Sequence, residues 1–196
     1  MAKNEQTKDR KTELVEAAAG LLAQHGEAGF NLRDVANAVG IKLASLQYHF
    51  PTKADLVSAI LQRTLETYLE EIEADLAALG GDPETQLEAA FRTLSRLDEL
   101  DDVEVRLEIH LWSMAQNDPS VHAALQSYHR FYIGKLTSLI VAARPEIGPD
   151  QARKRAVLIA SMQEGSMLFT DQGTTGVPHK AIREQVFRVT LEIAMA

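Results

Sequence analysis

Five residues whose types suit contact with a polyanion lie, with one alanine among them, in the short segment between Gly40 and Pro51. The segment offers an ammonium, two hydroxyls, a carboxamide and an imidazole but no carboxylate, although the whole chain has 28 Asp and Glu against 20 Lys and Arg. Amides and hydroxyls can hydrogen-bond base edges, and cationic side chains contact phosphates. The segment therefore predicts a nucleic-acid surface formed by Lys42, Ala44, Ser45, Gln47, Tyr48 and His49.

The rest of the sequence does not present a side-chain set for catalysis or metal binding. Without cysteine, the chain cannot hold a disulfide, a thiolate nucleophile or a cysteine zinc site. His110 with Glu108, and His122 with His129, are the imaginable metal pairs, but their spacing does not bring three donors to one ion. The sequence also lacks a glycine-rich phosphate loop. We therefore expect no metal, no cofactor and no catalytic residues.

Charge is distributed unevenly along the 196 residues. Residues 1–63 hold eight Lys and Arg against seven Asp and Glu, whereas residues 64–196 hold 12 against 21, for a formal charge of −8. Because an acidic body is repelled by phosphate, a near-neutral head is the end that should dock on DNA. A head with so little positive charge is expected to bind through a few well-placed contacts and as part of a dimer.

The elements that position these residues are all expected to be helices. Apolar residues recur with the 3.6-residue period of an α-helix, and no stretch alternates as a strand does. Caps, glycines and prolines divide the chain into nine helices, at about residues 7–25, 31–39, 43–49, 52–79, 82–100, 103–116, 118–143, 148–169 and 178–195. No run reaches the ~18 apolar residues of a membrane span, and no signal peptide is recognisable. The sequence predicts an all-α, cytoplasmic protein without a membrane contact.

The second and third of these helices have the geometry of a helix-turn-helix. Two helices of about two turns joined at Gly40 cannot bury much surface alone and must pack at a steep angle. This packing leaves the outer face of the second helix free to enter a major groove. Small apolar residues supply the contact between the two helices, namely Val35, Ala36, Val39, Ile41 and Leu46.

Residues 8 to 60 resemble the DNA-binding domain of the tetracycline-repressor-like (TetR) family of bacterial regulators. The family pattern is met by Gly26, Asp34-Val35-Ala36, Gly40-Ile41, Leu46-Gln47-Tyr48-His49-Phe50 and Lys53-Ala54-Asp55-Leu56. The chain departs from it at Gln47, where tyrosine is usual, at Asn31, where threonine is usual, and at Leu43, where a polar residue is common. Because a glutamine can pair with an adenine edge, the base preference is expected to differ from that of relatives with tyrosine.

The resemblance implies a role for each matching residue. Arg33 and Ser45 would lie at a phosphate or groove edge, Lys42 and Ala44 near bases, Tyr48 and His49 on phosphates, and Lys53 on a phosphate at a helix N-terminus. Free amides and the positive end of the helix dipole agree with that last role. The family architecture also implies a helix-turn-helix domain at residues 1–54 and a larger helical ligand-binding and dimerisation domain at residues 55–196.

Three helices of the body carry aromatic, methionine and isolated polar residues that could face one another. This composition suits an apolar pocket for a small-molecule effector, with a few orienting groups, and it equally suits an ordinary core. The candidate ligand-binding residues are His110, Trp112, Met114, Tyr128, Tyr132, Gln163 and Met167.

The last two helices carry apolar stripes with small residues that permit close helix approach, such as Ala152 and Ala156. The resemblance implies a four-helix bundle with a second copy of the chain, which would set the two DNA readers about 34–36 Å apart. An intramolecular core would use the same stripes.

These observations predict a dimeric transcriptional regulator of double-stranded DNA, most simply a repressor released from a palindromic operator by a small-molecule ligand. Two alternatives remain open, a helical adaptor that binds another protein through its head and an enzyme that uses the helical body. Salt separates the first alternative from DNA binding, because contacts to phosphates weaken steeply with salt and an apolar protein interface does not.

Overall fold

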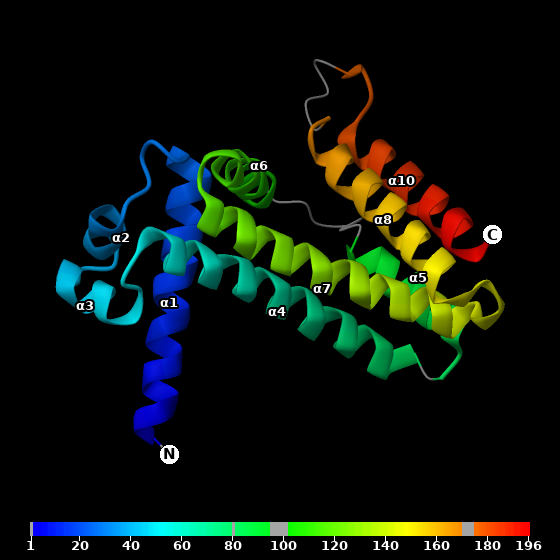
Figure 1. The fold of residues 1–196 in the computed structure, drawn as a ribbon, viewed down its shortest axis with the longest axis horizontal. Helices are drawn as coiled ribbons and strands as arrows, with labels where there is room; N and C mark the ends of the chain where they lie inside the picture. The colour runs from blue at the N-terminus through cyan, green and yellow to red at the C-terminus, as the bar shows by residue number, and fades with distance from the viewer. Residues whose placement is uncertain (1, 80, 95–101, 170–174) are drawn as a thin grey trace. The chain divides into compact units, whose positions relative to one another are not determined.

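The computed structural model describes residues 2–79, 81–94, 102–169 and 175–196 (Figure 1). Nine α-helices and one 3-10 helix make up the described part, which contains no strand. The helices are α1 Ala2–His25, α2 Leu32–Ala38, α3 Leu43–His49, α4 Lys53–Leu79, α5 Pro83–Leu94, α6 Asp102–Asn117, α7 Pro119–Ala143, η1 Pro145–Ile147, α8 Gly148–Met167 and α10 His179–Met195.

The all-α class is confirmed, and the helix boundaries differ from the expected ones at a few ends. α1 begins at Ala2, because residues 2–6 contain no glycine or proline that would stop a helix. The helix expected as far as Leu100 is described to Leu94, and its remainder lies outside the described residues. α8 ends at Met167, and Pro178 is the N-cap of α10 rather than its first residue.

The chain folds into two compact units that are not continuous in sequence. Met1–Glu66 and Asp101–Tyr128 form unit 1, and Thr67–Leu100 and His129–Ala196 form unit 2. α4 and α7 therefore contribute to both units. The boundary expected between residues 54 and 55 separates a DNA-binding domain from a ligand-binding and dimerisation domain. It is a division by function and stays a prediction.

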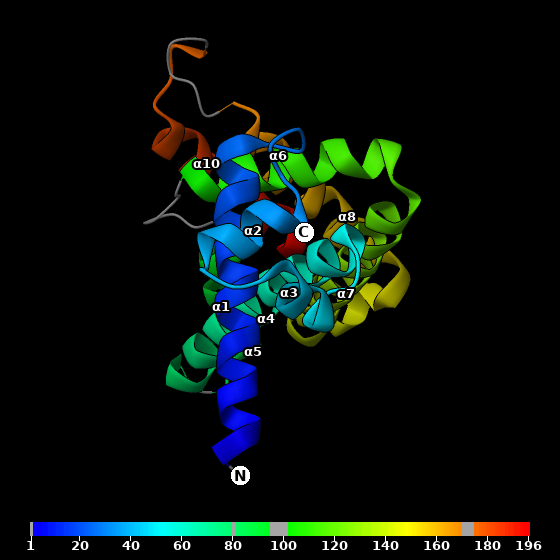
Figure 2. The ribbon, with the colours of Figure 1, turned by 90° about the vertical axis from the view of Figure 1, so that its left-hand side faces the viewer.

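Unit 1 is built around α1, which packs along α6 and α2 (Figure 2). Its core gathers buried apolar side chains from all of its helices, including Leu14, Leu22, Val35, Leu46, Phe50, Leu56, Leu111, Met114 and Val121. α1 ends at Gly26, whose positive φ of 65° favours a residue without a Cβ. The His110 ring of α6 covers this glycine so closely that a Cβ there would lie 2.9 Å from His110 Cε1.

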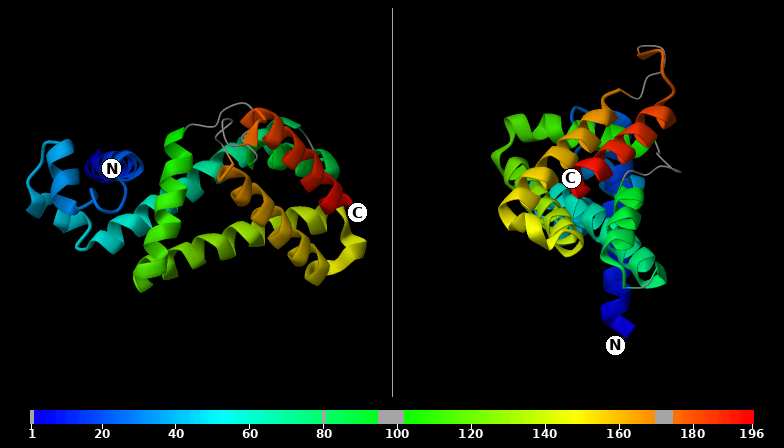
Figure 3. Two further views of the ribbon diagram at one scale, coloured as in Figure 1. Left: turned by 90° about the horizontal axis from the view of Figure 1, so that it is seen from above. Right: turned by 90° about the vertical axis from the view of Figure 1, so that its right-hand side faces the viewer.

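Unit 2 is centred on the pairing of α8 with α10, which run side by side in opposite directions (Figures 1 and 3). Its core contains Leu87, Phe91, Leu136, Ile140, Ala152, Ala156, Ile159, Ala160 and Ala194. α5 also packs against α10, where the Arg92 guanidinium lies 4.9 Å from the centre of the Phe187 ring.

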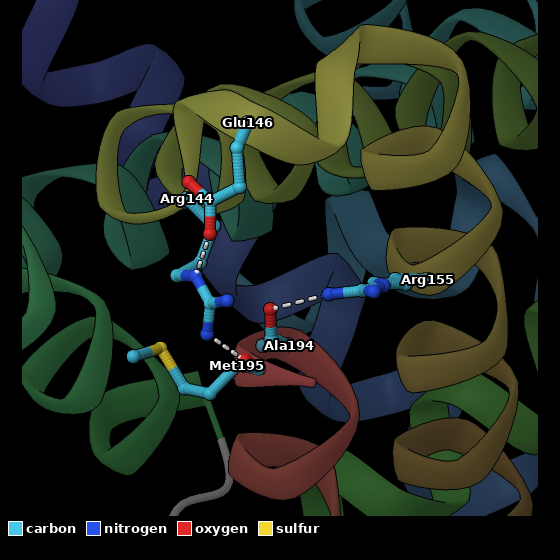
Figure 4. Close-up of polar contacts among 5 residues, drawn as sticks. All are labelled: Arg144, Glu146, Arg155, Ala194 and Met195. Carbon is cyan, nitrogen blue, oxygen red and sulfur yellow. Dashed lines mark hydrogen bonds and ion pairs between the residues drawn. The ribbon is translucent and has the colours of Figure 1, made fainter.

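Two arginines hold the C-terminal end of α10 (Figure 4). Arg155 Nη1 donates to the Ala194 carbonyl at 3.1 Å, and Arg144 Nη1 donates to the Met195 carbonyl. Arg144 Nε also pairs with Glu146. Two hydrogen bonds hold the pKa of Glu146 below its ordinary value: the larger effect comes from its own backbone amide and the smaller one from Arg144. The carbonyls of a last helical turn have no partner within the helix, so these guanidinium groups satisfy them.

Candidate DNA-binding site

The first helix of the predicted motif is fixed by a side-chain cap. Asn31 Oδ1 accepts hydrogen bonds from the amides of Arg33 at 3.0 Å and Asp34 at 3.1 Å, and Asn31 Nδ2 donates to Asp34 Oδ2 at 2.5 Å. The cap satisfies two of the amides that a helix start leaves free. Val35 and Ala36 point inward and are buried, so α2 presents Arg33 outward.

The turn between α2 and α3 closes with a Schellman motif. The Ile41 amide donates to the Ala36 carbonyl at 2.9 Å, and the Gly40 amide donates to the Asn37 carbonyl at 3.1 Å. Gly40 has a φ of 68°, the left-handed conformation that this turn requires and that glycine adopts without strain. The predicted tight turn at Gly40 is therefore confirmed.

α3 has one buried side and one side that faces solvent. Leu46 is fully buried, and Ile41 and Leu43 are half-buried. On the other side, Tyr48 is 84% exposed, far more than expected of an aromatic side chain that serves only packing. The remaining exposed residues of this outer face, which we call the α3 face, are Lys42, Ala44, Ser45 and Gln47.

An array of rings continues the α3 face at the C-terminal end of the helix. His49 is half-buried, with its ring edge-on to Tyr48 at 5.3 Å between centroids and tilted against Phe50 at 6.4 Å. Phe50 is 2% exposed and therefore belongs to the core of unit 1. The imidazole is thus held between a core ring and an exposed ring.

Lys53 is the first residue of α4, as expected. A reciprocal cap fixes this helix start, since the Asp55 amide donates to Thr52 Oγ1 at 3.1 Å and the Thr52 amide donates to Asp55 Oδ2 at 2.9 Å. Lys53 Nζ lies 3.7 Å from Glu27 Oε1 and 5.6 Å from the centre of the Phe30 ring. The ammonium is therefore placed by two partners from the loop between α1 and α2.

All eight expected DNA contacts lie in unit 1. Six are exposed on α2, on α3 or just before it, and His49 and Lys53 are half-buried by the partners named above. The structure brings them onto the motif that the sequence indicated, and contact with DNA itself stays a prediction. The sequence did not indicate Glu27 as the partner of Lys53, because no local pattern links a loop residue to a helix start so far along the chain.

The seven expected ligand contacts are divided between the two units. In unit 1, Met114 is fully buried in the core, Tyr128 packs against that core, His110 covers Gly26, and Trp112 is 43% exposed. In unit 2, the Tyr132 hydroxyl donates to Oε1 of the buried Gln163, and Met167 is half-buried near the end of α8. Their role in ligand binding stays a prediction.

Unit 2 contains a histidine–carboxylate contact that sequence reasoning missed. His129 Nε2 lies 3.2 Å from Glu164 Oε1. Glu164 follows Gln163 in α8, and His129 precedes Tyr132 by one turn of α7. The two pairs form a polar cluster between α7 and α8, consisting of His129, Tyr132, Gln163 and Glu164. The isolated Gln163 and Tyr132 were visible in the sequence, but the register of α7 against α8 was not.

Two further observations bear on the kind of protein. Among the described residues, no three His, Asp or Glu side chains are grouped as a metal site would need. None of the described helices is long and apolar enough to cross a membrane.

The geometry of unit 1 defines a helix-turn-helix DNA-binding protein, and comparison with known proteins identifies its family. Residues 14–60 match the family described as bacterial regulatory proteins, tetR family, and residues 83–192 match the C-terminal part of BetI-type transcriptional repressors. The chain belongs to the TetR family of transcriptional regulators.

Individual relatives agree with this assignment. The HTH-type transcriptional regulator CymR of Pseudomonas putida is 30% identical over 122 residues, 62% of this chain and 59% of that protein. BetI of Rhizobium meliloti is 25% identical over 170 residues, 86% of this chain and 80% of that protein. The chain spans less than two thirds of the length of CymR and of two further curated relatives. These relatives are named as transcriptional regulators and not as enzymes.

The fold is shared with solved structures at low sequence identity. A transcriptional regulator from Saccharomonospora viridis, solved in complex with choline, superposes with a TM-score of 0.73 at 19% identity, covering 91% of this chain and 94% of that one. The likeness therefore extends over nearly the whole helical architecture, including the body.

Proposed function

We propose that this regulator is a dimeric repressor, which binds a two-fold symmetric operator through unit 1 and is released by a small-molecule effector bound among its C-terminal helices. The observation that supports DNA binding most directly is the α3 face. An exposed tyrosine, a lysine, a glutamine and a serine share one side of a short helix whose other side is anchored by a buried leucine. This is the arrangement with which a recognition helix enters the major groove.

Dimerisation is supported by α8, which is apolar on more than one side. Its buried side packs within unit 2 through Ala152, Ala156 and Ile159. Outside this contact, Val157 is 43% exposed and Leu158 is 50% exposed. A helix that is apolar beyond the stripe its own protomer covers needs another partner, and a second copy of α8 and α10 supplies one with the two-fold symmetry of an operator.

The effector is proposed to be small and apolar or cationic. The acidic balance of residues 64–196 disfavours a polyanion. The polar cluster of unit 2 includes the Glu164 carboxylate, whose side chain is 24% exposed, and the Tyr132 hydroxyl. A carboxylate beside an aromatic residue attracts a cation, and a relative of this fold has been solved with choline.

The decisive experiment is a salt series of binding to the promoter fragment upstream of the protein's own coding region, with the wild type, Lys53→Ala and Lys135→Ala. Lys135 is a matched control, because it also lies over a phenylalanine ring, that of Phe131 at 5.7 Å, but belongs to unit 2. We expect steep salt dependence that only Lys53→Ala reduces. Absence of duplex binding even at low salt would overturn the proposal.

The dimer and the effector need separate measurements. Leu158→Glu should give a monomer in sedimentation equilibrium with weakened operator binding, whereas Ala123→Glu, at an exposed position of α7, should leave both unchanged. A calorimetric titration with choline, repeated on the operator complex, tests the release mechanism. Linkage requires DNA to weaken effector binding by the same factor by which the effector weakens DNA binding, typically about 5 to 150-fold.

A further inference from the structure

We propose that Lys11 of α1 is an additional phosphate contact, outside the helix-turn-helix. The proposal rests on the proposed function, since it requires unit 1 to bind duplex DNA. It extends the DNA-binding surface to a helix to which the sequence motif assigns no contact.

The position of Lys11 is set by the core residue that follows α3. Its Nζ lies 5.5 Å from the centre of the Phe50 ring, within the range of a cation–π contact. Phe50 is 2% exposed and so cannot move aside, while Lys11 itself is exposed. The contact therefore favours a position of the ammonium beside Phe50, while the Lys11 side chain remains exposed to solvent.

The Phe50 ring also contacts the His49 ring, which connects it to the α3 face. Because His49 packs against Phe50 and Tyr48 packs against His49, the four side chains form a continuous row from α1 to the exposed Tyr48. Lys11 thus extends the end of the α3 face that is expected to contact phosphates. A DNA strand presents a phosphate about every 3.4 Å of helix axis, so the polar groups on either side of Phe50 can reach different phosphates of one strand.

The charge of Lys11 is more available than that of Lys53 or of Arg10. Lys53 is 3.7 Å from Glu27, and Arg10 is paired with Glu13. Arg10 also points its Nη2 at the Val39 carbonyl, 3.5 Å away at the end of α2. Lys11 makes no ion pair within the part of the chain that the structure describes, and a π face does not neutralise it. An unneutralised lysine on a flexible stem suits a point contact to phosphate.

The arrangement gives α1 two distinct tasks at the reading motif. Arg10 fastens α1 to the last turn of α2, and Lys11 places a charge beside the last turn of α3. Because phosphates are the same in every sequence, the Lys11 contact should strengthen binding to any duplex and should not change the preference for the operator.

The test compares the slope of log affinity against log salt for the wild type, Lys11→Gln, Lys11→Arg and Lys135→Gln, on the operator and on an unrelated duplex. Each phosphate contact contributes about 0.9 to the slope, so Lys11→Gln should lower it by roughly that amount per protomer on both duplexes. Lys11→Arg should retain it. Lys135→Gln removes a similar lysine–phenylalanine contact in unit 2 and should leave the slope unchanged.

The outcomes separate this proposal from the proposed function. If the wild type binds with a steep slope and Lys11→Gln does not reduce it, the Lys11 contact is refuted and the repressor function stands. If Lys135→Gln reduces the slope equally, the effect is one of net charge, which also refutes the contact. If the wild type binds no duplex, both proposals fail. Thermal unfolding of each variant shows that the head remains folded during the comparison.

Discussion

Replacing Gly26 by alanine tests how tightly α6 is packed against the end of α1. The substitution introduces a Cβ at a φ of 65°, where a residue with a side chain is strained by roughly 1–2 kcal/mol. About 0.4–1 kcal/mol of this is offset because alanine lowers the entropy of the unfolded chain. The new Cβ would also lie 2.9 Å from His110 Cε1, and overpacking of this kind typically costs about 1–3 kcal/mol.

Gly40 supplies a matched control for the strain alone. Its φ is 68°, almost the same as at Gly26, but a Cβ there would meet nothing within 4 Å. Gly40→Ala should therefore lower the free energy of unfolding by about 1 kcal/mol or less. Gly26→Ala should lower it by roughly 2–3 kcal/mol, and the excess should come from the His110 ring.

The assay is equilibrium denaturation of both single variants, of His110→Ala and of the double variant Gly26→Ala/His110→Ala. Removing the imidazole makes room for the new Cβ. The double variant should therefore lose about 1 kcal/mol or more less unfolding free energy than the sum of the losses in the two single variants. If Gly26→Ala and Gly40→Ala are equally destabilising, or the two losses simply add, the ring does not close the space over Gly26 and the reasoning is refuted.

Two further predictions concern hydrogen bonds. Bonds from the hydroxyl and amide of Ser120 hold the pKa of Asp118 below its ordinary value of 3.8, so the stabilisation is present above that pH and is lost as the pH falls through the lowered pKa. Asp118→Asn should remove this part of the acid dependence in denaturation midpoints measured across the acid range, and an identical profile in both proteins would contradict it. Tyr132→Phe removes the hydroxyl that donates to Oε1 of the buried Gln163 and should lower the free energy of unfolding by about 0.5–1.5 kcal/mol. Adding Gln163→Leu should recover part of that loss. If the losses of the two single variants simply add in the double variant, the hydrogen bond between Tyr132 and Gln163 is not formed in solution.

Local signals in the sequence were sufficient to predict the reading motif. Asn31 and the Thr52–Asp55 pair act as helix caps through bonds between neighbours three residues apart, and Gly40 supplies a conformation that its own backbone dictates. The inward side of α3 followed from the helical period, which places Leu46 opposite the polar residues. Interactions of this range depend little on the rest of the fold.

Contacts between distant helices could not be predicted in the same way. The ring of His110 over Gly26, Lys11 over Phe50 and the pairing of His129 with a carboxylate of α8 each depend on how two helices are turned and shifted against each other. A periodic pattern fixes which side of a helix is buried but not which residue of the partner it meets. This is why His110, grouped in the sequence with ligand contacts, is found against the end of α1.

The two arginines that bind the last carbonyls of α10 affect the order in which parts of the protein unfold. Terminal helices commonly fray from their free end, but here guanidinium groups from the start of η1 and from α8 hold the last carbonyls, and Ala194 is fully buried beneath them. α10 should therefore melt together with α8 as one cooperative segment. If the proposed dimer forms through this pair of helices, its surface would be preformed. The protomers would then separate as folded monomers before they unfold, and assembly would be limited by encounter and not by folding.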